Sequence, residues 1–263
     1  MIASGSCGEN LTWSLNEAGK MTISGFGPMD DYADGTAPWF DHAASIISLT
    51  VEEGVTSIGA YAFCRSSALQ EVYIPTTMVK FGYCAFWICG SVTKLYIEDL
   101  AAWCSITFDG PQSTPVGHSS SMDYSNIYIN GELVKDLVIP MGVTEISDYA
   151  FYRIGGLKSV TFSSSVTKIG KQAFASCFSL SSFDIPESVV EIGINAISTD
   201  SLKAIRINGS GKLFHDTAIA CGNLKEVHID SIKNWLSHTF ETEKANPTYF
   251  AKGLYHGITF RCR

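Results

Sequence analysis

The sequence is poor in charged residues, and most of its net charge has one sign. Charged residues make up 17% of the 263 positions, and 18 Lys and Arg are outnumbered by 26 Asp and Glu, which gives a net charge of −8. This balance excludes the broad basic surface that is typical of nucleic-acid-binding proteins. The sequence also lacks any run of about 18 apolar residues, so we expect no membrane-spanning helix.

The familiar catalytic, nucleotide-binding and metal-binding motifs are missing as well. There is no GxSxG nucleophile elbow, no GxxxxGK(S/T) or GxGxxG phosphate loop, and no HExxH or CxxC pair. Asp30, Asp34, Gly35 and Asp41 have part of the spacing of a calcium loop, but Tyr32 stands where a carboxylate or amide is required. We therefore expect no catalytic residues, no bound metal and no cofactor.

What the sequence does contain is an internal repeat. The unit reads LxxVxIPxxVxxIGxxAFxxC and is clearest in residues 69–89, 157–177 and 180–197. Successive anchor residues are 23, 23, 42, 23, 23, 22 and 22 positions apart, so one interval contains an insertion. The anchors are Val51, Ile74, Ile97, Ile139, Phe162, Ile185, Ile207 and Ile229. A sustained period of this length indicates a stacked repeat architecture.

Each unit is predicted to hold one short strand followed by corners. The alternation LxxVxI places Val and Ile on one face of the strand, and the residue between them faces outward. The proline that follows cannot donate to a ladder and so ends the strand. Gly59, Gly82, Gly170 and Gly193 are predicted to supply unusual backbone angles at a sharp corner. Because one unit cannot bury its apolar side alone, the units are predicted to stack in parallel.

The pattern Ile-Pro…Val-x-x-Ile-Gly-x-x-Ala-Phe, over about residues 45–230, resembles the BspA-type (Treponema pallidum-type) leucine-rich repeats. The resemblance implies an α/β-type repeat solenoid: a right-handed leucine-rich repeat, mostly parallel β with short helical or 3-10 segments. It also implies a bacterial protein that is secreted or on the cell surface, although the first residues carry no signal peptide. Two coils depart from the pattern. Ser147 replaces a glycine, and the coil that contains Leu213 lacks the Val-x-x-Ile-Gly step.

Charge and repeat content divide the chain near residue 44. Residues 1–64 hold one basic and eight acidic residues, whereas the remainder hold 17 and 18. Residues 1–44 do not repeat, and two alternating stretches within them, 11–15 and 21–23, predict a β-hairpin. We therefore predict an N-terminal capping segment, 1–44, and a leucine-rich repeat solenoid, 45–263.

Two insertions, near 98–132 and 230–257, resemble each other. In each, a Trp lies six residues after the anchor, and Phe and Pro follow that Trp by five and twelve residues. We predict a short helix in each that carries Trp103 or Trp235 onto the core, and then, after the first, a hairpin with an Asn130-Gly131 turn. A comparable return strand begins near Leu254, which leaves open whether the natural chain continues past Arg263.

The eight cysteines do not have the density of a disulfide framework. Cys64, Cys89, Cys177 and Cys221 recur in the same part of their units, close to the Ala-Phe or Ala-Ile step, which predicts small buried thiols. The disulfide state of the non-repeat cysteines Cys7, Cys104 and Cys262 is left open by the sequence.

The strand alternation also predicts a surface. Two residues of each unit project outward from the concave sheet, one between the Val and the Ile and one two positions earlier. Tyr73 and Tyr96 are predicted to stack one coil apart, beside Glu71 and Lys94, and tyrosine is a common hot-spot residue. Further along the same rows lie Asp184, Arg206 and His228. We predict that these seven residues bind a ligand; the alternative is an exposed ladder that only stabilises the sheet.

The sequence therefore predicts a non-enzymatic module for protein binding or adhesion through the concave sheet. The expected partner is a host or bacterial surface protein, with a glycan as the second choice, and no nucleic acid. One alternative is a structural spacer within a larger surface protein. The other is a carbohydrate-binding module in which Tyr73 and Tyr96 stack on sugar rings.

Overall fold

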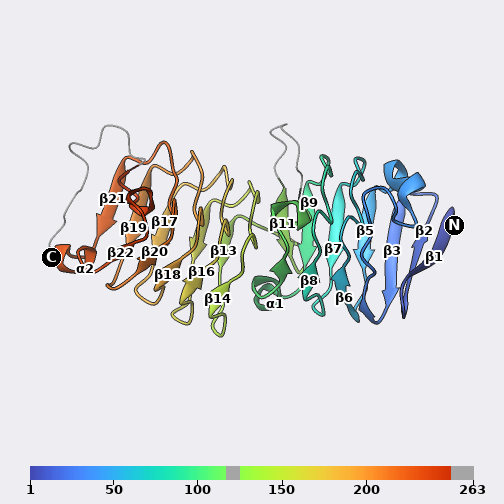
Figure 1. Cartoon of the computed structure of the whole chain (residues 1–263), viewed down its shortest axis with the longest axis horizontal. Helices are drawn as coiled ribbons and strands as arrows, with labels where there is room; N and C mark the ends of the chain where they lie inside the picture. Colours follow the sequence, from blue (N-terminus) through green and yellow to red (C-terminus); the bar gives the residue numbers. More distant parts are fainter. Residues whose placement is uncertain (117–124, 250–263) are drawn as a thin grey trace. The chain divides into compact units, whose positions relative to one another are not determined.

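The computed structural model describes residues 1–116 and 125–249. The chain divides into two compact units, Met1–Leu133 and Val134–Arg263. Each unit is by itself a solenoid built mainly from stacked parallel strands, with a few short helices (Figure 1). This confirms the predicted fold class, whereas the division between residues 1–44 and 45–263 stays a prediction.

The first unit has an eight-stranded main sheet. In spatial order its strands are β1 (Ala3–Gly8), β2 (Leu11–Leu15), β3 (Lys20–Gly25), β5 (Ser48–Val51), β7 (Glu71–Ile74), β9 (Lys94–Ile97), β11 (Asn126–Ile129) and β12 (Glu132–Val134). β2 pairs antiparallel with β1 and β3, so the hairpin expected near the N-terminus is present. From β3 to β11 the pairing is parallel, one strand per coil. β7 ends directly before Pro75, because proline cannot extend the ladder.

A second, four-stranded sheet completes the coils of the first unit. Its strands, in spatial order, are β10 (Thr107–Phe108), β8 (Lys80–Phe81), β6 (Val55–Ile58) and β4 (Gly27–Pro28). The helical segments described in this unit are η1 (Phe40–Ser45), α1 (Leu100–Cys104) and η2 (Pro111–Ser113). Each coil therefore contributes one strand to each sheet and closes around the core through turns.

The second unit repeats this arrangement with three smaller sheets. On one side lie β13 (Asp136–Val138) with β15 (Ser159–Thr161), and β17 (Phe183–Ile185) with β19 (Ala204–Ile207) and β21 (Glu226–Ile229). The third sheet contains β14 (Glu145–Ile146), β16 (Lys168–Ile169), β18 (Glu191–Ile192), β20 (Leu213–Phe214) and β22 (Thr239–Phe240). The helical segments are α2 (Ile232–Trp235) and η3 (Glu243–Ala245). All the pairs in these sheets are parallel.

Stacked phenylalanine rings form the repeating part of the core. In the first unit the ring centroids of Phe63 and Phe86 are 5.4 Å apart, and in the second those of Phe151 and Phe174 are 5.1 Å apart. The alanine before each of these rings is also buried. Parallel strands about 4.8 Å apart bring equivalent side chains to stacking distance. The Ala-Phe step of the repeat therefore places one ring of each of these coils in the core.

The four repeat glycines do not have the backbone angles predicted for them. Gly59, Gly82, Gly170 and Gly193 all lack a positive φ. A Cβ on Gly82 would instead lie 2.5 Å from the backbone nitrogen of Ala60. The prediction is wrong because the constraint is the close approach of one coil to the next, which only a missing side chain permits. The left-handed angles fall two residues later, at Tyr61, Cys84, Gln172 and Asn195.

The repeat cysteines form the buried thiols that were predicted. The thiol of Cys89 donates to the carbonyl of Phe63 at 3.0 Å, and the thiol of Cys177 donates to that of Phe151 at 3.2 Å. Each of these hydrogen bonds joins one coil to the coil before it. Of the non-repeat cysteines, Cys7 and Cys104 are buried free thiols, and Cys262 lies outside the described residues.

Both insertions contain the predicted short helix. α1 is capped by Asp99, whose carboxylate accepts hydrogen bonds from the backbone N–H groups of Ala101 and Ala102. After α1, β11 and β12 pair as the predicted hairpin, with φ of 51° at Asn130 and 81° at Gly131, as a two-residue hairpin turn requires. The second return strand, predicted near Leu254, lies outside the described residues.

Only one of the two insertion tryptophans reaches the core. Trp103 is buried, with its ring against Phe81 of the preceding coil and Phe108 of its own. Trp235 is half-buried, and within the described part of the chain its ring contacts are to His238 and Phe240 of its own insertion. The prediction is therefore wrong for Trp235, because its side chain stays partly exposed and is not among the buried core residues.

The coil that lacks the Val-x-x-Ile-Gly step keeps its strand, since β20 pairs in parallel with β18. Its Lys212 is fully buried, and the ammonium group donates hydrogen bonds to the carbonyls of Pro186, Glu187 and Val189. Burial lowers the pKa of Lys212 to about 8. The second unit thus has a buried cation satisfied by main-chain oxygens.

Candidate recognition surface

Three tyrosines stack across β7, β9 and β11 of the first unit. Tyr73 pairs with Tyr96, and Tyr96 pairs with Tyr128, in one continuous register. The ring centroids of Tyr73 and Tyr96 are 4.3 Å apart with planes 2° apart, and those of Tyr96 and Tyr128 are 4.7 Å and 26° apart. We call Tyr73, Tyr96 and Tyr128 the tyrosine ladder. The predicted stacking of the first two is confirmed.

Tyr128 is the functional candidate that sequence reasoning missed. Its strand, Ile127-Tyr128-Ile129, has the same alternation as Leu95-Tyr96-Ile97, which was the signal available. The insertion places the two tyrosines further apart than one repeat, so Tyr128 fell in the predicted hairpin and outside the repeat register.

Glu71 and Lys94 lie beside the ladder and neutralise each other. The Lys94 ammonium is 2.7 Å from a Glu71 carboxylate oxygen, and the Tyr73 hydroxyl donates to the other oxygen at 3.0 Å. The hydrogen bond from Lys94 lowers the pKa of Glu71, and burial together with the Glu71 charge raises the pKa of Tyr73. These contacts fix the orientation of the Tyr73 ring and leave no uncompensated charge at this end of the strands.

One end of the tyrosine ladder has an open ring face. Thr50 of β5 is the register partner of Tyr73 on the side away from Tyr96. A threonine side chain is much shorter than a tyrosine ring, so it cannot cover that face. Among the described residues, the only ring that stacks on Tyr73 is Tyr96. The Tyr73 face above β5 is therefore available for contact.

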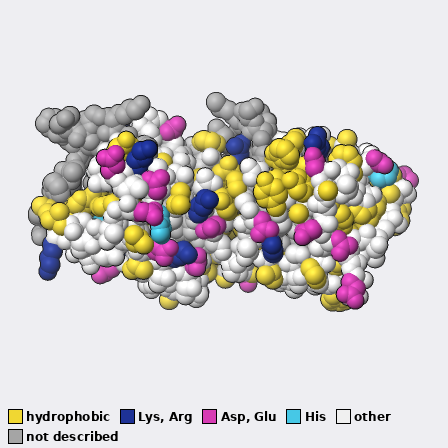
Figure 2. All heavy atoms as spheres, in the orientation of Figure 1, with side chains coloured by type: hydrophobic (Ala, Val, Ile, Leu, Met, Phe, Trp, Pro, Cys, Tyr) yellow, Lys and Arg dark blue, Asp and Glu magenta, His cyan; other side chains and the backbone are white. Residues whose placement is uncertain are grey.

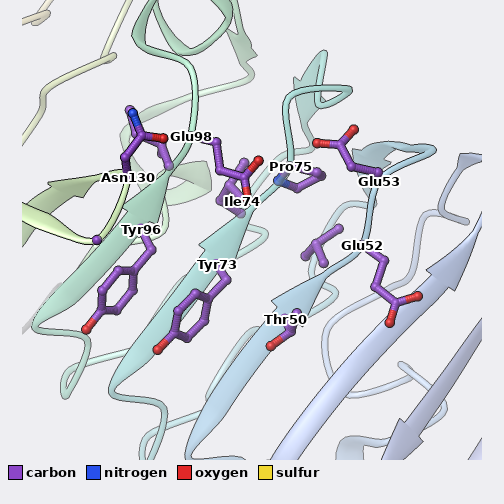
Figure 3. A pocket seen from close by; sticks show the side chains of 12 residues that line it. Thr50, Glu52, Glu53, Tyr73, Ile74, Pro75, Tyr96, Glu98 and Asn130 are labelled. Atoms are coloured by element: carbon purple, nitrogen blue, oxygen red, sulfur yellow. The ribbon is translucent and has the colours of Figure 1, made fainter.

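A groove of about 610 Å³ lies over this open face, within the usual range of ligand pockets. Its lining comes from the ends of β5, β7 and β9 and from the Asn130–Gly131 turn. Figure 3 shows the rings of Tyr73 and Tyr96 parallel to each other, with Glu52 and Glu53 after β5 and Glu98 after β9. On the face drawn in Figure 2, hydrophobic side chains gather over the region of β7 and β9.

The remaining predicted site residues lie in the second unit. Asp184, Arg206 and His228 are register neighbours on β17, β19 and β21. The Arg206 guanidinium is 3.6 Å from the Asp184 carboxylate, and the His228 ring is 2.9 Å from the Glu226 carboxylate. Both Asp184 and Arg206 are largely exposed, so their ion pair contributes little to stability. The seven predicted residues thus form two sets, four in the first unit and three in the second.

Within residues 1–116 and 125–249, no three His, Cys, Asp or Glu side chains converge to hold a metal ion. Asp34, part of the calcium-like spacing, is instead bound by the Arg65 guanidinium at 2.6 Å. None of the helices in the described part of the chain is long and apolar enough to span a membrane.

Comparisons with known proteins found one matching family model and several similar solved structures. Residues 37–110 and 124–246 match a family model described as BspA type leucine rich repeat region, in six copies. Similar solved structures include a leucine-rich repeat protein from Eubacterium ventriosum (21% identity, 87% of this chain and 79% of that chain, TM-score 0.38) and the T. pallidum leucine-rich repeat protein (19%, 85% and 81%, 0.35). A leucine-rich cell surface protein from Faecalibacterium prausnitzii has 16% identity over 93% of this chain and 96% of that chain, with a TM-score of 0.30. No curated protein matches the chain.

Proposed function

Because the chain belongs to the BspA-type leucine-rich repeat family, we propose that it is a non-enzymatic, secreted or cell-surface module that binds a partner protein. The contact surface is the outward face of the main sheet of the first unit, with the tyrosine ladder at its centre. Stacked repeats present extended surfaces that suit macromolecular partners. The outward residues Asp184, Arg206 and His228 of the second unit are proposed as a separate contact set.

The observation that supports this proposal most strongly is the tyrosine ladder. Tyrosine is enriched at interface hot spots because a rigid ring buries much area and its hydroxyl keeps a polar contact. Stacking and the hydrogen bond from Tyr73 to Glu71 already hold the rings in place. Little side-chain entropy is therefore lost when a partner covers them.

The test is a binding screen of the whole chain against purified extracellular proteins and a glycan array. Tyr73→Ala/Tyr96→Ala serves as the loss variant. Tyr83→Ala is the matched control, since Tyr83 is 53% exposed and lies outside the main sheet. We expect a protein partner whose affinity falls about tenfold or more in the double variant and is unchanged in the control. Circular dichroism checks that both variants are folded.

Three other results would redirect the proposal. A glycan signal that the double variant loses would make the chain a carbohydrate-binding module. A partner that binds the double variant as tightly as the unchanged chain would exclude the ladder as the contact. Binding to neither panel would favour a structural spacer.

A further inference from the structure

The groove beside Tyr73 has charge of one sign only. Its lining contains three carboxylates, from Glu52, Glu53 and Glu98, and no Lys, Arg or His. Among the described residues, the carboxylates of Glu52 and Glu98 make no hydrogen bond or ion pair. Glu53 is held by Thr76, whose backbone N–H and hydroxyl donate at 2.6 Å and 2.9 Å. An occupant with positive charge is therefore needed for charge complementarity.

A small metal ion does not fit this arrangement. In the described part of the chain no three acidic, histidine or cysteine side chains come close enough to chelate one. The carboxylates instead stand apart, at the ends of β5 and β9, on either side of the strand that carries Tyr73. Lys94 does not neutralise these carboxylates either, since its ammonium is already bound to Glu71 at 2.7 Å. The occupant must be an extended cation that spans an aromatic face and a carboxylate.

The open face of Tyr73 selects among extended cations. A guanidinium group is planar, so it stacks on an aromatic ring while its edge N–H groups donate to a carboxylate in pairs. An ammonium group is compact and strongly hydrated and cannot do both as well. The groove provides a ring face above Thr50 and, two residues further along the chain, the carboxylate of Glu52. Figure 3 shows this carboxylate pointing away from the Tyr73 ring, so different residues of one basic segment would reach the ring and the carboxylate.

We propose that this groove binds an arginine side chain in an extended basic segment of the partner protein, with the guanidinium on the open face of Tyr73 and the positive charge of the segment matched by Glu52 and Glu98. The inference rests on the proposed function, because it names the chemistry of the partner for the same surface. A groove of about 610 Å³ has room for neighbouring residues of such a segment as well as for one side chain.

The test uses acetyl-tetra-arginine amide as the probe, titrated into the whole chain by calorimetry at low ionic strength. The matched peptides are tetra-citrulline, a neutral isostere of the guanidinium, and tetra-lysine. The loss variant is Glu52→Gln/Glu98→Gln, which preserves side-chain shape. The control variant is Glu9→Gln/Glu17→Gln, which removes the same charge from exposed sites outside the groove.

We expect tetra-arginine to bind about tenfold more weakly to Glu52→Gln/Glu98→Gln and equally well to the control variant. Tyr73→Ala should also weaken binding, and tetra-citrulline should not bind. Equal loss in the two glutamine variants would show attraction to net charge alone and overturn the proposal. Equal affinity of the unchanged chain for tetra-lysine and tetra-arginine would overturn the guanidinium assignment. This comparison does not depend on the folding of any variant.

The result also separates this inference from the proposed function. Suppose that tetra-arginine fails to bind, while a partner protein binds the unchanged chain but not Tyr73→Ala/Tyr96→Ala. The ladder is then a recognition surface, and the arginine assignment is wrong. If tetra-arginine binds in the groove but no partner protein depends on the two tyrosines, the groove is a cation site and the proposed function is wrong.

Discussion

Gly82 shows at the residue scale how closely the coils approach. A Cβ at this position would meet the Ala60 nitrogen at 2.5 Å and the Gly59 carbonyl carbon at 2.9 Å. We expect Gly82→Ala to lower the free energy of unfolding by about 1–3 kcal/mol, the usual cost of overpacking. Gly110→Ala is the control, because its backbone is extended and a Cβ there meets nothing closer than 3.7 Å. Urea unfolding measures both, and equal effects would contradict this account of the repeat glycines.

Lys212 makes a second prediction at this scale, about pH. Burial lowers its pKa to about 8 in the folded state, from an ordinary value of 10.5. Between these two values the unfolded chain binds a proton that the folded chain does not, so the contribution of Lys212 to stability rises with pH. The unfolding free energy of the unchanged chain minus that of Lys212→Met should therefore rise by about 2 kcal/mol from pH 7 to pH 10. A difference that is constant across this range would show that Lys212 is not buried as a cation.

At the scale of elements, the two insertions differ in how their tryptophans pack. Trp103 on α1 lies between rings of two coils, whereas Trp235 at the end of α2 meets, among the described residues, only rings of its own insertion. Trp103→Ala should cost about 3–5 kcal/mol, as for a large ring removed from a core, and Trp235→Ala about 1–2 kcal/mol. If Trp103→Ala does not fold, Trp103→Phe should still destabilise more than Trp235→Phe in the same unfolding assay. A larger effect at Trp235 would contradict the observed packing.

The elements also show what the sequence alone could predict. The anchor spacing located most of the main-sheet strands, because the position of a strand follows from a local period. Tyr128 was missed because the insertion breaks that period, and the repeat glycines were misread because the distance between coils is not visible in one unit. The groove was not predicted, since it also depends on where the Asn130–Gly131 turn of the insertion lies, and the repeat does not specify that position.

For the whole molecule, the packing of the coils predicts low thiol reactivity. All seven described cysteines are buried, and burial raises the pKa of Cys177 to about 12 and of Cys221 to about 11. Because the thiolate is the reactive form, we expect no more than about one of the eight thiols to react quickly with a thiol reagent in the native state. All eight should react in denaturant. Rapid reaction of several native thiols would mean that the coils open far more readily than their packing implies.

The central claim is that the tyrosine ladder is covered by a partner protein. Hydroxyl-radical footprinting of the whole chain, with and without the partner found in the screen, measures this without any substitution. The account predicts that Tyr73 and Tyr96 become protected in the complex while Tyr83 stays as reactive as in the free chain. A complex in which Tyr73 and Tyr96 keep their reactivity, or in which protection falls on Tyr83 instead, would contradict it.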